Sequence, residues 1–352
     1  MLNFITERKS LWERLKETKK PIVLYGMGDG AQKIIDQLNE RNIPLADIFA
    51  SDEFVRGHSF NGIRVKKYSE IEQLYDDFFV LIGFAVNYDS MIDRLFEIGA
   101  SRETAAPDVP LFGEGVFDFE FVEKNAEKIS EVYSLLADEH SKKVYANIIN
   151  YKISGNIEYL RDISTDRQAD LQELFEFSDN EDYLDLGAYD GDTVQEFISL
   201  TEGKFRSITA LEPDAKNFKK LISATENDSR ITCVQKAVWD DDVVLRFNNK
   251  AGRNSALNDS GRVEVEATSV DNLSKNGFSF IKMDVEGAEK QTLEGAKRTI
   301  AECKPKLFIA AYHRNEDIFE LPLQVLSLNG DYRIYFRKHP YIPAWEINIF
   351  AK

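Results

Sequence analysis

Apolar and polar positions follow a strand–helix rhythm near the start of the chain. Short apolar runs such as 78–84 alternate with stretches whose apolar residues recur at helical spacing, as Ile34, Ile35 and Leu38 do. A buried strand has a short apolar run, whereas an amphipathic helix repeats its apolar positions every three to four residues. Residues 1–110 are therefore predicted to form a small Rossmann-like parallel α/β domain.

The pattern changes after this first stretch. From residue 112 to residue 177 the apolar positions keep a helical period, and no convincing strand pattern appears. We interpret residues 111–178 as a helical connector. It is expected either to cover part of the following domain or to form the contact of a homo-oligomer.

The strand–helix alternation returns from residue 179 and continues to residue 352. This alternation is typical of a doubly wound α/β domain, here larger than the first. Strands are predicted at 182–186, 206–211, 230–234, 243–247, 263–269, 278–283, 306–312, 332–337 and 345–350. Helices are predicted near 192–201, 214–224, 287–300 and 317–328.

Composition and charge narrow the range of partners. The chain has 352 residues, of which 43% are hydrophobic, and its net charge is −17. Such a surface repels phosphate backbones and anionic membranes, so a nucleic-acid partner is not expected.

No apolar run approaches the roughly 18 residues of a membrane span, and no signal-peptide pattern is visible. Its two cysteines cannot form a disulfide framework. We therefore expect a cytoplasmic protein.

Carboxylates gather where the predicted strands of the second domain end. Asp185, Glu212 and Asp284 each lie at a strand end, and a glycine turn follows the first of them. Open α/β sheets bind ligands outside the carboxyl ends of their strands. Glu212 ends the next strand after the glycine turn. A carboxylate at that position is suited to accept hydrogen bonds from two ribose hydroxyls. A dinucleotide and S-adenosylmethionine both satisfy this pattern.

The acidity of the glycine turn discriminates between these two cofactors. Asp190 and Asp192 lie in the turn and would repel the pyrophosphate of a dinucleotide. S-adenosylmethionine instead carries an ammonium and a sulfonium, which carboxylates favour. Glycine at 187 and 191 is expected to let the backbone approach this cofactor without an intervening Cβ.

An ordered set of motifs resembles the FkbM family of S-adenosylmethionine-dependent O-methyltransferases. The resemblance covers roughly residues 180–350 and rests on "LDLGAYDGDT", "LEPD", "AVWD", "SVDNL" and "FIKMDVEGAEKQTLEGA". It implies a seven-stranded methyltransferase fold that ends in an antiparallel hairpin. It also implies methyl transfer to a hydroxyl of a sugar or related metabolite, in surface polysaccharide or secondary metabolite biosynthesis.

The resemblance also assigns site residues. Glu212 is implied to bind the ribose, and Asp284 to face the reacting end. The loop at 248–257 is expected to approach the cofactor or the acceptor. The cofactor-binding set implied is Asp185, Gly187, Ala188, Tyr189, Gly191, Glu212, Pro213, Ala237, Val238, Asp284 and Glu286.

Asp284 and His313 are the candidate catalytic bases, because each follows a predicted strand near the expected methyl group. Transfer to a hydroxyl needs alignment and removal of the hydroxyl proton. Asp284 could instead cap the next helix, and His313 could be a hydrogen-bonded structural histidine.

No metal is expected, and His58, His140 and His339 are given no role. Arg337 and Tyr341 are candidates for the acceptor pocket.

Two other classes of function remain open from the sequence. Gly26, Gly28 and Gly30 follow a strand, and Asp52 follows the next one, which imitates a nucleotide-binding fingerprint. The spacing departs from G-x-G-x-x-G. The alternatives are a nicotinamide-dependent oxidoreductase and a non-catalytic nucleotide-sugar binding module that uses this turn.

Overall fold

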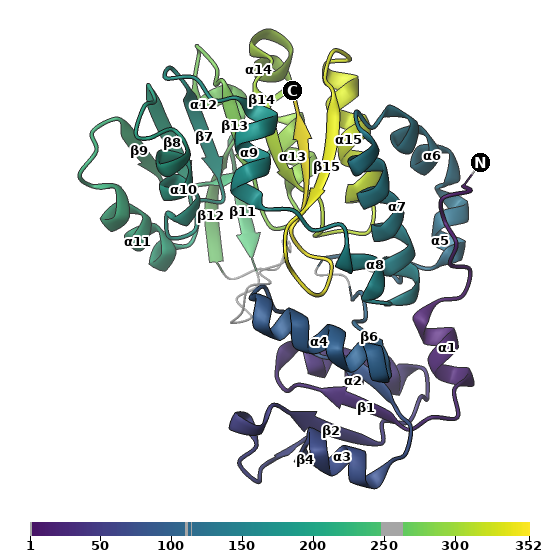
Figure 1. Ribbon diagram of the computed structural model, residues 1–352. Coiled ribbons are helices and arrows are strands. Elements are labelled where there is room, and N and C mark those ends of the chain that lie inside the picture. Colours follow the sequence, from purple (N-terminus) through teal and green to yellow (C-terminus); the bar gives the residue numbers. More distant parts are fainter. Residues whose placement is uncertain (1, 110–111, 114, 248–262) are drawn as a thin grey trace.

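The computed structural model describes residues 2–109, 112–113, 115–247 and 263–352. Two α/β domains are joined by a run of helices, as Figure 1 shows. The predicted fold class is confirmed, with a seven-stranded sheet in the second domain and a smaller, mainly parallel sheet in the first.

The first domain is a sheet with helices on both faces. All its strand pairs are parallel except β3 with β4. Alternate residues of the strands face opposite sides, so α1 and α2 pack on one face and α3 and α4 on the other. The strands, in spatial order, are β3 (Ser59–Phe60), β4 (Ile63–Lys67), β2 (Asp47–Ala50), β1 (Ile22–Tyr25), β5 (Phe79–Ile82) and β6 (Glu103–Ala105). The helices are α1 (Leu11–Glu17), α2 (Asp29–Glu40), α3 (Tyr68–Leu74) and α4 (Asp89–Ser101).

The connector is helical in the structure and covers the second domain. In α7, Asp138 caps the N-terminus by accepting from the backbone N of Ser141, and Gly155 ends the helix in the left-handed region. The Ser141 hydroxyl in turn accepts from the backbone N of Phe336 in the second domain. None of the described helices has both the length and the apolar character that a membrane crossing requires. The connector helices are α5 (Phe119–Lys124), α6 (Ala126–Leu135), α7 (Glu139–Ser154), α8 (Glu158–Arg161) and α9 (Arg167–Phe175).

The second domain is built on the seven-stranded sheet. Its strands pair in parallel except for β16, which runs antiparallel to both neighbours and forms the expected final hairpin with β15. In spatial order the strands are β15 (Ile334–Lys338), β16 (Ile347–Ala351), β14 (Lys306–Ala310), β13 (Phe280–Met283), β7 (Asp182–Leu186), β8 (Ser207–Leu211) and β9 (Ile231–Val234). The helices are α10 (Asp192–Leu200), α11 (Ala215–Thr225), α12 (Val270–Leu273), α13 (Glu289–Glu294), α14 (Lys297–Cys303) and α15 (Asp317–Leu328).

Two predicted features of this domain differ in detail. The strands β11 (Val243–Phe247) and β12 (Val263–Thr268) form a separate three-stranded sheet with β10 (Ala237–Val238), and they do not join the main sheet. The single helix predicted near 287–300 is two helices, α13 and α14, separated at Gly295. A Cβ on Gly295 would lie 2.3 Å from the backbone oxygen of Trp239, so the helix break follows the close approach of that loop.

A continuous apolar core joins the two domains through the connector. One cluster of buried side chains includes Val80 of β5, Ile148 of α7 and Ile281 of β13. Burial of apolar surface stabilises such contacts in proportion to the area removed from water. The first domain is therefore packed onto the rest of the chain, and α4 lies on the side that faces the second domain (Figure 1).

Candidate functional site

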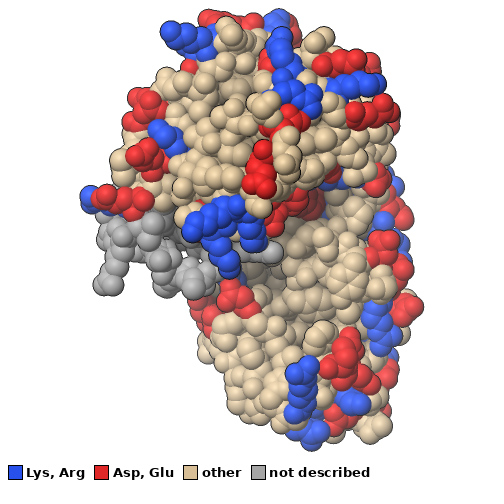
Figure 2. Space-filling view, turned by 90° about the vertical axis from the view of Figure 1, so that its left-hand side faces the viewer, with Lys and Arg blue, Asp and Glu red and all other residues tan. Residues whose placement is uncertain are grey.

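A cavity of about 1240 Å³ opens where the strands β7, β8 and β13 end, in the region where the two domains meet. The surface is hollowed between the domains in Figure 2. This volume exceeds the range of roughly 300–1,000 Å³ typical of a site for one small ligand. It leaves room for a cofactor and a second molecule. The predicted residues that line it are Gly187, Tyr189, Glu212, Pro213, Ala237, Val238, Asp284 and Glu286.

The two glycines of the turn after β7 are required by the protein's own packing. At Gly187 φ is +79°, and a Cβ there would lie 1.9 Å from the backbone oxygen of Asp284. At Gly191 φ is +94°, and a Cβ would lie 3.3 Å from the side chains of Leu221 and Ala224 in α11. We expected both glycines to make room for the ligand. The close approach of the neighbouring strand end and helix already requires glycine at both positions, and the role of these glycines toward a ligand stays a prediction.

Asp185 lies behind the cavity wall and organises the turn. Its buried carboxylate accepts a hydrogen bond of 2.5 Å from the Thr193 hydroxyl and lies 3.1 Å from Nζ of Lys282. Lys282 also donates to the backbone oxygen of Gly187 at 2.7 Å. Burial lowers the pKa of Lys282, but the carboxylates of Asp185 and Asp284 outweigh it and raise that pKa overall. The lysine is therefore a buried cation that holds the turn in place.

Lys282 was missed from the sequence. A lysine in the middle of the apolar strand "FIKM" was the available signal, because an ionised side chain is rarely buried without a partner. Its partner, Asp185, was singled out for the ligand. The ion pair with Lys282 instead uses the Asp185 carboxylate inside the fold.

Glu212 is a buried carboxylate at the end of β8. Its two oxygens accept hydrogen bonds from the backbone N of Tyr189 at 3.0 Å and of Asp214 at 2.9 Å. Burial raises the pKa of Glu212 to about 7, against the opposing effect of these two hydrogen bonds. A carboxylate has about four acceptor positions, so this one can accept two further donors from the cavity. That capacity fits a pair of neighbouring hydroxyl groups.

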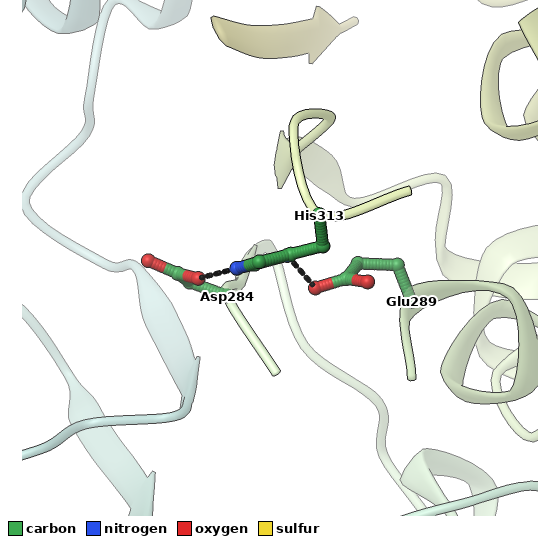
Figure 3. Close-up of side chains that lie close together, drawn as sticks. All are labelled: Asp284, Glu289 and His313. Carbon is green, nitrogen blue, oxygen red and sulfur yellow. Dashed lines mark hydrogen bonds and ion pairs between the residues drawn. The ribbon is translucent and has the colours of Figure 1, made fainter. Parts of the chain in front are cut away.

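Acidic side chains surround His313 beside the cavity, as Figure 3 shows for Asp284 and Glu289. The imidazole is 1% exposed. Its Nδ1 lies 2.9 Å from Oε1 of Glu289, and its Nε2 lies 3.4 Å from Oδ1 of Asp284 and 3.6 Å from Oε2 of Glu286. Glu289 Oε1 also accepts from the backbone N of Val285 at 3.0 Å, which connects the histidine to the loop after β13.

The charge state of His313 argues against its use as a base. Burial lowers the pKa of its imidazole, but Glu289, Asp284 and Glu286 together raise it to about 10. The ring therefore carries its proton at neutral pH. Asp284 remains the candidate proton acceptor: its carboxylate is 35% exposed, lines the cavity, and accepts hydrogen bonds from the Tyr312 hydroxyl at 3.3 and 3.4 Å.

His313→Gln is expected to destabilise the protein most at low pH. A histidine whose folded-state pKa is raised contributes stability that is present below its ordinary value of 6.5 and is lost as pH rises through about 10. Denaturant unfolding at about pH 6 and about pH 10 should show the free-energy difference between wild type and His313→Gln shrinking with pH. A difference that stays constant over this range would contradict a charged His313.

The same cluster contains the candidate metal ligands among the described residues. Asp284, Glu289 and His313 each offer a ligand atom, and these atoms lie within 4.8 Å of one another. However, Oε1 of Glu289 already accepts from Val285, Gly287 and the imidazole. The imidazolium also supplies positive charge where a metal would. The expectation that no metal is used stays a prediction.

Several cavity residues come from elements that the sequence did not associate with the site. His339, which was given no role, lines the cavity, and its Nε2 lies 3.2 Å from Oδ2 of Asp170. Tyr341 lines the cavity as proposed, whereas Arg337 is buried in ion pairs with Asp138 and Asp170. Other lining residues that the sequence did not indicate include Asn87, Asp89, Phe112, Arg167, Thr193, Glu196, Arg314 and Glu346. The loop predicted at 248–257 lies outside the described residues.

The glycine turn of the first domain also has a packing explanation. A Cβ on Gly26 would lie 2.7 Å from the Phe84 ring, and a Cβ on Gly30 would lie 2.8 Å from the backbone oxygen of Gly83. The segment that follows β5 thus approaches the turn closely at both positions. These two glycines are explained without a bound nucleotide.

The chain was compared with known protein families and with solved structures, and both comparisons give matches. Residues 185–343 match the family described as the methyltransferase FkbM domain. The chain is also similar to the crystal structure of methyltransferase FkbM from Methylobacillus flagellatus KT, with a TM-score of 0.73 and 22% sequence identity over 95% of this chain and 90% of that chain. This likeness shows a shared fold that includes the first domain.

Other solved structures resemble about half of the chain. An rRNA methylase from Streptococcus thermophilus has a TM-score of 0.36 and 11% identity over 53% of this chain and 92% of its own. The fibrillarin of Aeropyrum pernix, solved with S-adenosyl-L-methionine, has a TM-score of 0.34 and 14% identity over 53% of this chain and 73% of its own. No curated protein matches the chain.

Proposed function

Since residues 185–343 belong to the FkbM methyltransferase family, we propose that this protein transfers a methyl group from S-adenosylmethionine to a hydroxyl of a sugar or related metabolite. The observation that carries the proposal is the placement of Glu212 and Asp284 in one cavity. The first offers acceptor positions for a ribose, and the second offers a carboxylate for the proton of the attacking hydroxyl. The choice of oxygen as the methylated atom, and the place of the product in surface polysaccharide or secondary metabolite biosynthesis, rest on the family resemblance.

The residues that would hold the cofactor follow the order of the strands. S-adenosylmethionine supplies, when bound, a methyl group on a positively charged sulfur. Glu212 would bind the ribose hydroxyls, and Ala237 and Val238, which are apolar and line the cavity, would contact the adenine. The carboxylates of Asp192 and Asp284, which also line the cavity, favour a ligand that carries positive charge.

The chain itself would align the acceptor and accept its proton. Alignment of two reactants contributes roughly 7–11 kcal/mol to lowering a barrier, and a positioned base adds roughly 10²–10⁴-fold. Tyr312 and His313 contact Asp284 from the same loop, so they hold its carboxylate toward the cavity. Both groups can donate to the carboxylate, and its remaining acceptor positions can receive a hydrogen bond from the acceptor hydroxyl.

Calorimetric titration with S-adenosylhomocysteine tests the proposal directly. The wild-type protein is expected to bind this product and not NAD, NADP or a nucleotide-sugar, and Glu212→Ala should weaken binding by about 100-fold, the loss of hydrogen bonds to a charged acceptor. If only NAD or the nucleotide-sugar bound, and Glu212→Ala bound it equally well, the methyltransferase proposal would fall. The nicotinamide-dependent oxidoreductase or nucleotide-sugar module would then take its place.

The affinity for S-adenosylhomocysteine is expected to depend on pH through Glu212. Its pKa of about 7 means that much of the carboxyl is protonated below neutrality, whereas two hydroxyl donors require the ionised form. Binding below pH 7 then releases a proton, so affinity should rise by up to about tenfold per pH unit towards neutrality and level off above it. Titrations between about pH 5.5 and about pH 8 measure this slope. In Glu212→Gln the slope should vanish, and a slope that persists there would assign the proton to another group.

A further inference from the structure

The loop between β5 and α4, residues 83–88, belongs to the first domain but is attached to the rim of the cavity in the second. The backbone N of Val86 donates to the backbone oxygen of Ile342 at 2.8 Å, and the backbone N of Ile342 donates back to Val86 at 2.9 Å. Both side chains are buried, and Ile342 lies in the segment between β15 and β16. Paired backbone hydrogen bonds of this kind fix the two segments relative to each other.

The first part of the same loop fills the place where the first domain would bind a ligand of its own. Open α/β sheets bind ligands where the strand order reverses, which in this sheet is between β1 and β5. There the Phe84 ring lies against Gly26 and packs edge-on against Tyr25, with 4.9 Å between the ring centres. The ligand crevice expected for this fold is therefore occupied by the protein's own aromatic side chain.

The end of the loop and the first residue of α4 present polar groups to the cavity. Asn87 and Asp89 line it, although they are far in sequence from the other lining residues. Both side chains are exposed, so they are accessible to a second molecule. The amide of Asn87 offers two donors and an acceptor, and the carboxylate of Asp89 offers acceptors only, a combination suited to hydroxyl groups.

The charges around the cavity indicate which hydroxyl-bearing molecule fits. Among the residues that the structure describes, acidic lining residues outnumber basic ones by eight to four. Such a cavity disfavours a phosphorylated acceptor, because like charges repel across a partly desolvated site. The acidic residues are Asp89, Asp192, Glu196, Glu212, Asp214, Asp284, Glu286 and Glu346, and the basic residues are Arg167, Lys236, Lys282 and Arg314.

An aromatic pair lies in the segment that Val86 contacts. The rings of Tyr341 and Trp345 are 5.4 Å apart between centres, and Tyr341 lines the cavity. Aromatic faces pack against the apolar C–H groups of a ligand while polar side chains bind its polar groups. The rim therefore combines an aromatic surface with Asn87 and Asp89.

We propose that the β5–α4 loop recognises the methyl acceptor and that the acceptor is a neutral, hydroxyl-rich sugar. Asn87 and Asp89 would hydrogen-bond to hydroxyls away from the one that is methylated. The first domain is then a specificity module of the methyltransferase. This inference rests on the proposed function, because it presupposes that the donor occupies the Glu212 side of the cavity.

The experiment measures sugar binding to the full chain saturated with S-adenosylhomocysteine. The probes are the methyl glycosides of glucose, galactose, mannose, rhamnose and fucose, with glucose 6-phosphate as the charged comparison, in calorimetry and saturation-transfer NMR. For the sugar that binds best, Asn87→Ala and Asp89→Ala should each weaken binding by about tenfold, the loss of one or two hydrogen bonds. The matched control is Asp93→Ala, an exposed acid in the next turn of α4, which should change nothing. Affinity for S-adenosylhomocysteine should be the same in all four proteins.

The results separate this inference from the proposed function. If the wild type failed to bind S-adenosylhomocysteine, the proposed function would fail, and this inference with it. If it bound S-adenosylhomocysteine but none of the neutral sugars, or bound glucose 6-phosphate as tightly as them, the acceptor class would be wrong. If Asn87→Ala and Asp89→Ala bound the sugar as tightly as Asp93→Ala does, the loop would have no part in recognition, while the donor site would stand.

Discussion

Asp284→Asn is expected to lower kcat for methyl transfer by about 10²–10⁴-fold, the range associated with a positioned base. The substitution keeps the size of the side chain and its contact with the Tyr312 hydroxyl but removes the charge that accepts the proton. Binding of S-adenosylhomocysteine should be largely unchanged, because this product lacks the sulfonium charge that Asp284 favours. Initial rates with labelled S-adenosylmethionine, beside calorimetry with S-adenosylhomocysteine, give both quantities.

Glu286→Gln is the matched control for Asp284. Glu286 lies in the same loop and also lines the cavity, but its carboxylate is 56% exposed and 3.6 Å from Nε2 of His313. The two acids therefore differ mainly in burial and position. If Glu286→Gln lowered kcat as much as Asp284→Asn, the loss would reflect the total charge of the cavity and not a base at position 284. If neither variant lowered kcat, alignment of the methyl donor and the acceptor would account for the rate without a base.

Gly187→Ala is expected to destabilise the second domain by about 3 kcal/mol or more and to abolish binding of S-adenosylhomocysteine. Two costs combine at this position. The positive φ of +79° strains any residue with a Cβ, at about 1–2 kcal/mol. The added carbon would lie 1.9 Å from the backbone oxygen of Asp284, so the ends of β7 and β13 would have to separate. That separation would displace both halves of the proposed site.

Gly203→Ala measures the cost of backbone strain at positive φ alone. Its φ is +72°, and no atom lies within 4 Å of a Cβ built there, so only backbone strain applies. Denaturant unfolding should show a loss of about 1–2 kcal/mol for Gly203→Ala, with binding retained. The opposite result would be an equal loss of unfolding free energy in the two variants, with S-adenosylhomocysteine still bound by Gly187→Ala. It would show that the turn at Gly187 can move to accept a Cβ, so its close approach to Asp284 does not define the site.

Local patterning was sufficient for most of the fold. The strands β7, β8, β13 and β14 lie within a few residues of the predicted ranges, because a buried strand needs a continuous apolar run whatever its partners. Glu212 and Asp284 were also predictable. Each follows a strand directly, and the carboxyl ends of parallel strands meet at one edge of a sheet. The ordered motifs around them led to the family that the comparison confirms.

Partner choice was not predictable for the strands β11 and β12. Their apolar alternation is the same as that of a strand in the main sheet, because alternation reports one buried face and not the identity of the neighbouring strand. In the structure they pair with each other and with β10, apart from the seven-stranded sheet.

By itself, the sequence determined which residues form strands and helices, which carboxylates lie at the strand ends, and which family the second domain resembles. Only the tertiary structure decided the charge of His313, the partner of Lys282, and the presence of Asn87 and Asp89 at the cavity. The physical reason is the range of the interactions. Apolar periodicity and turn chemistry act between residues a few positions apart, whereas a pKa or a cavity wall depends on burial and on charges brought together from distant segments.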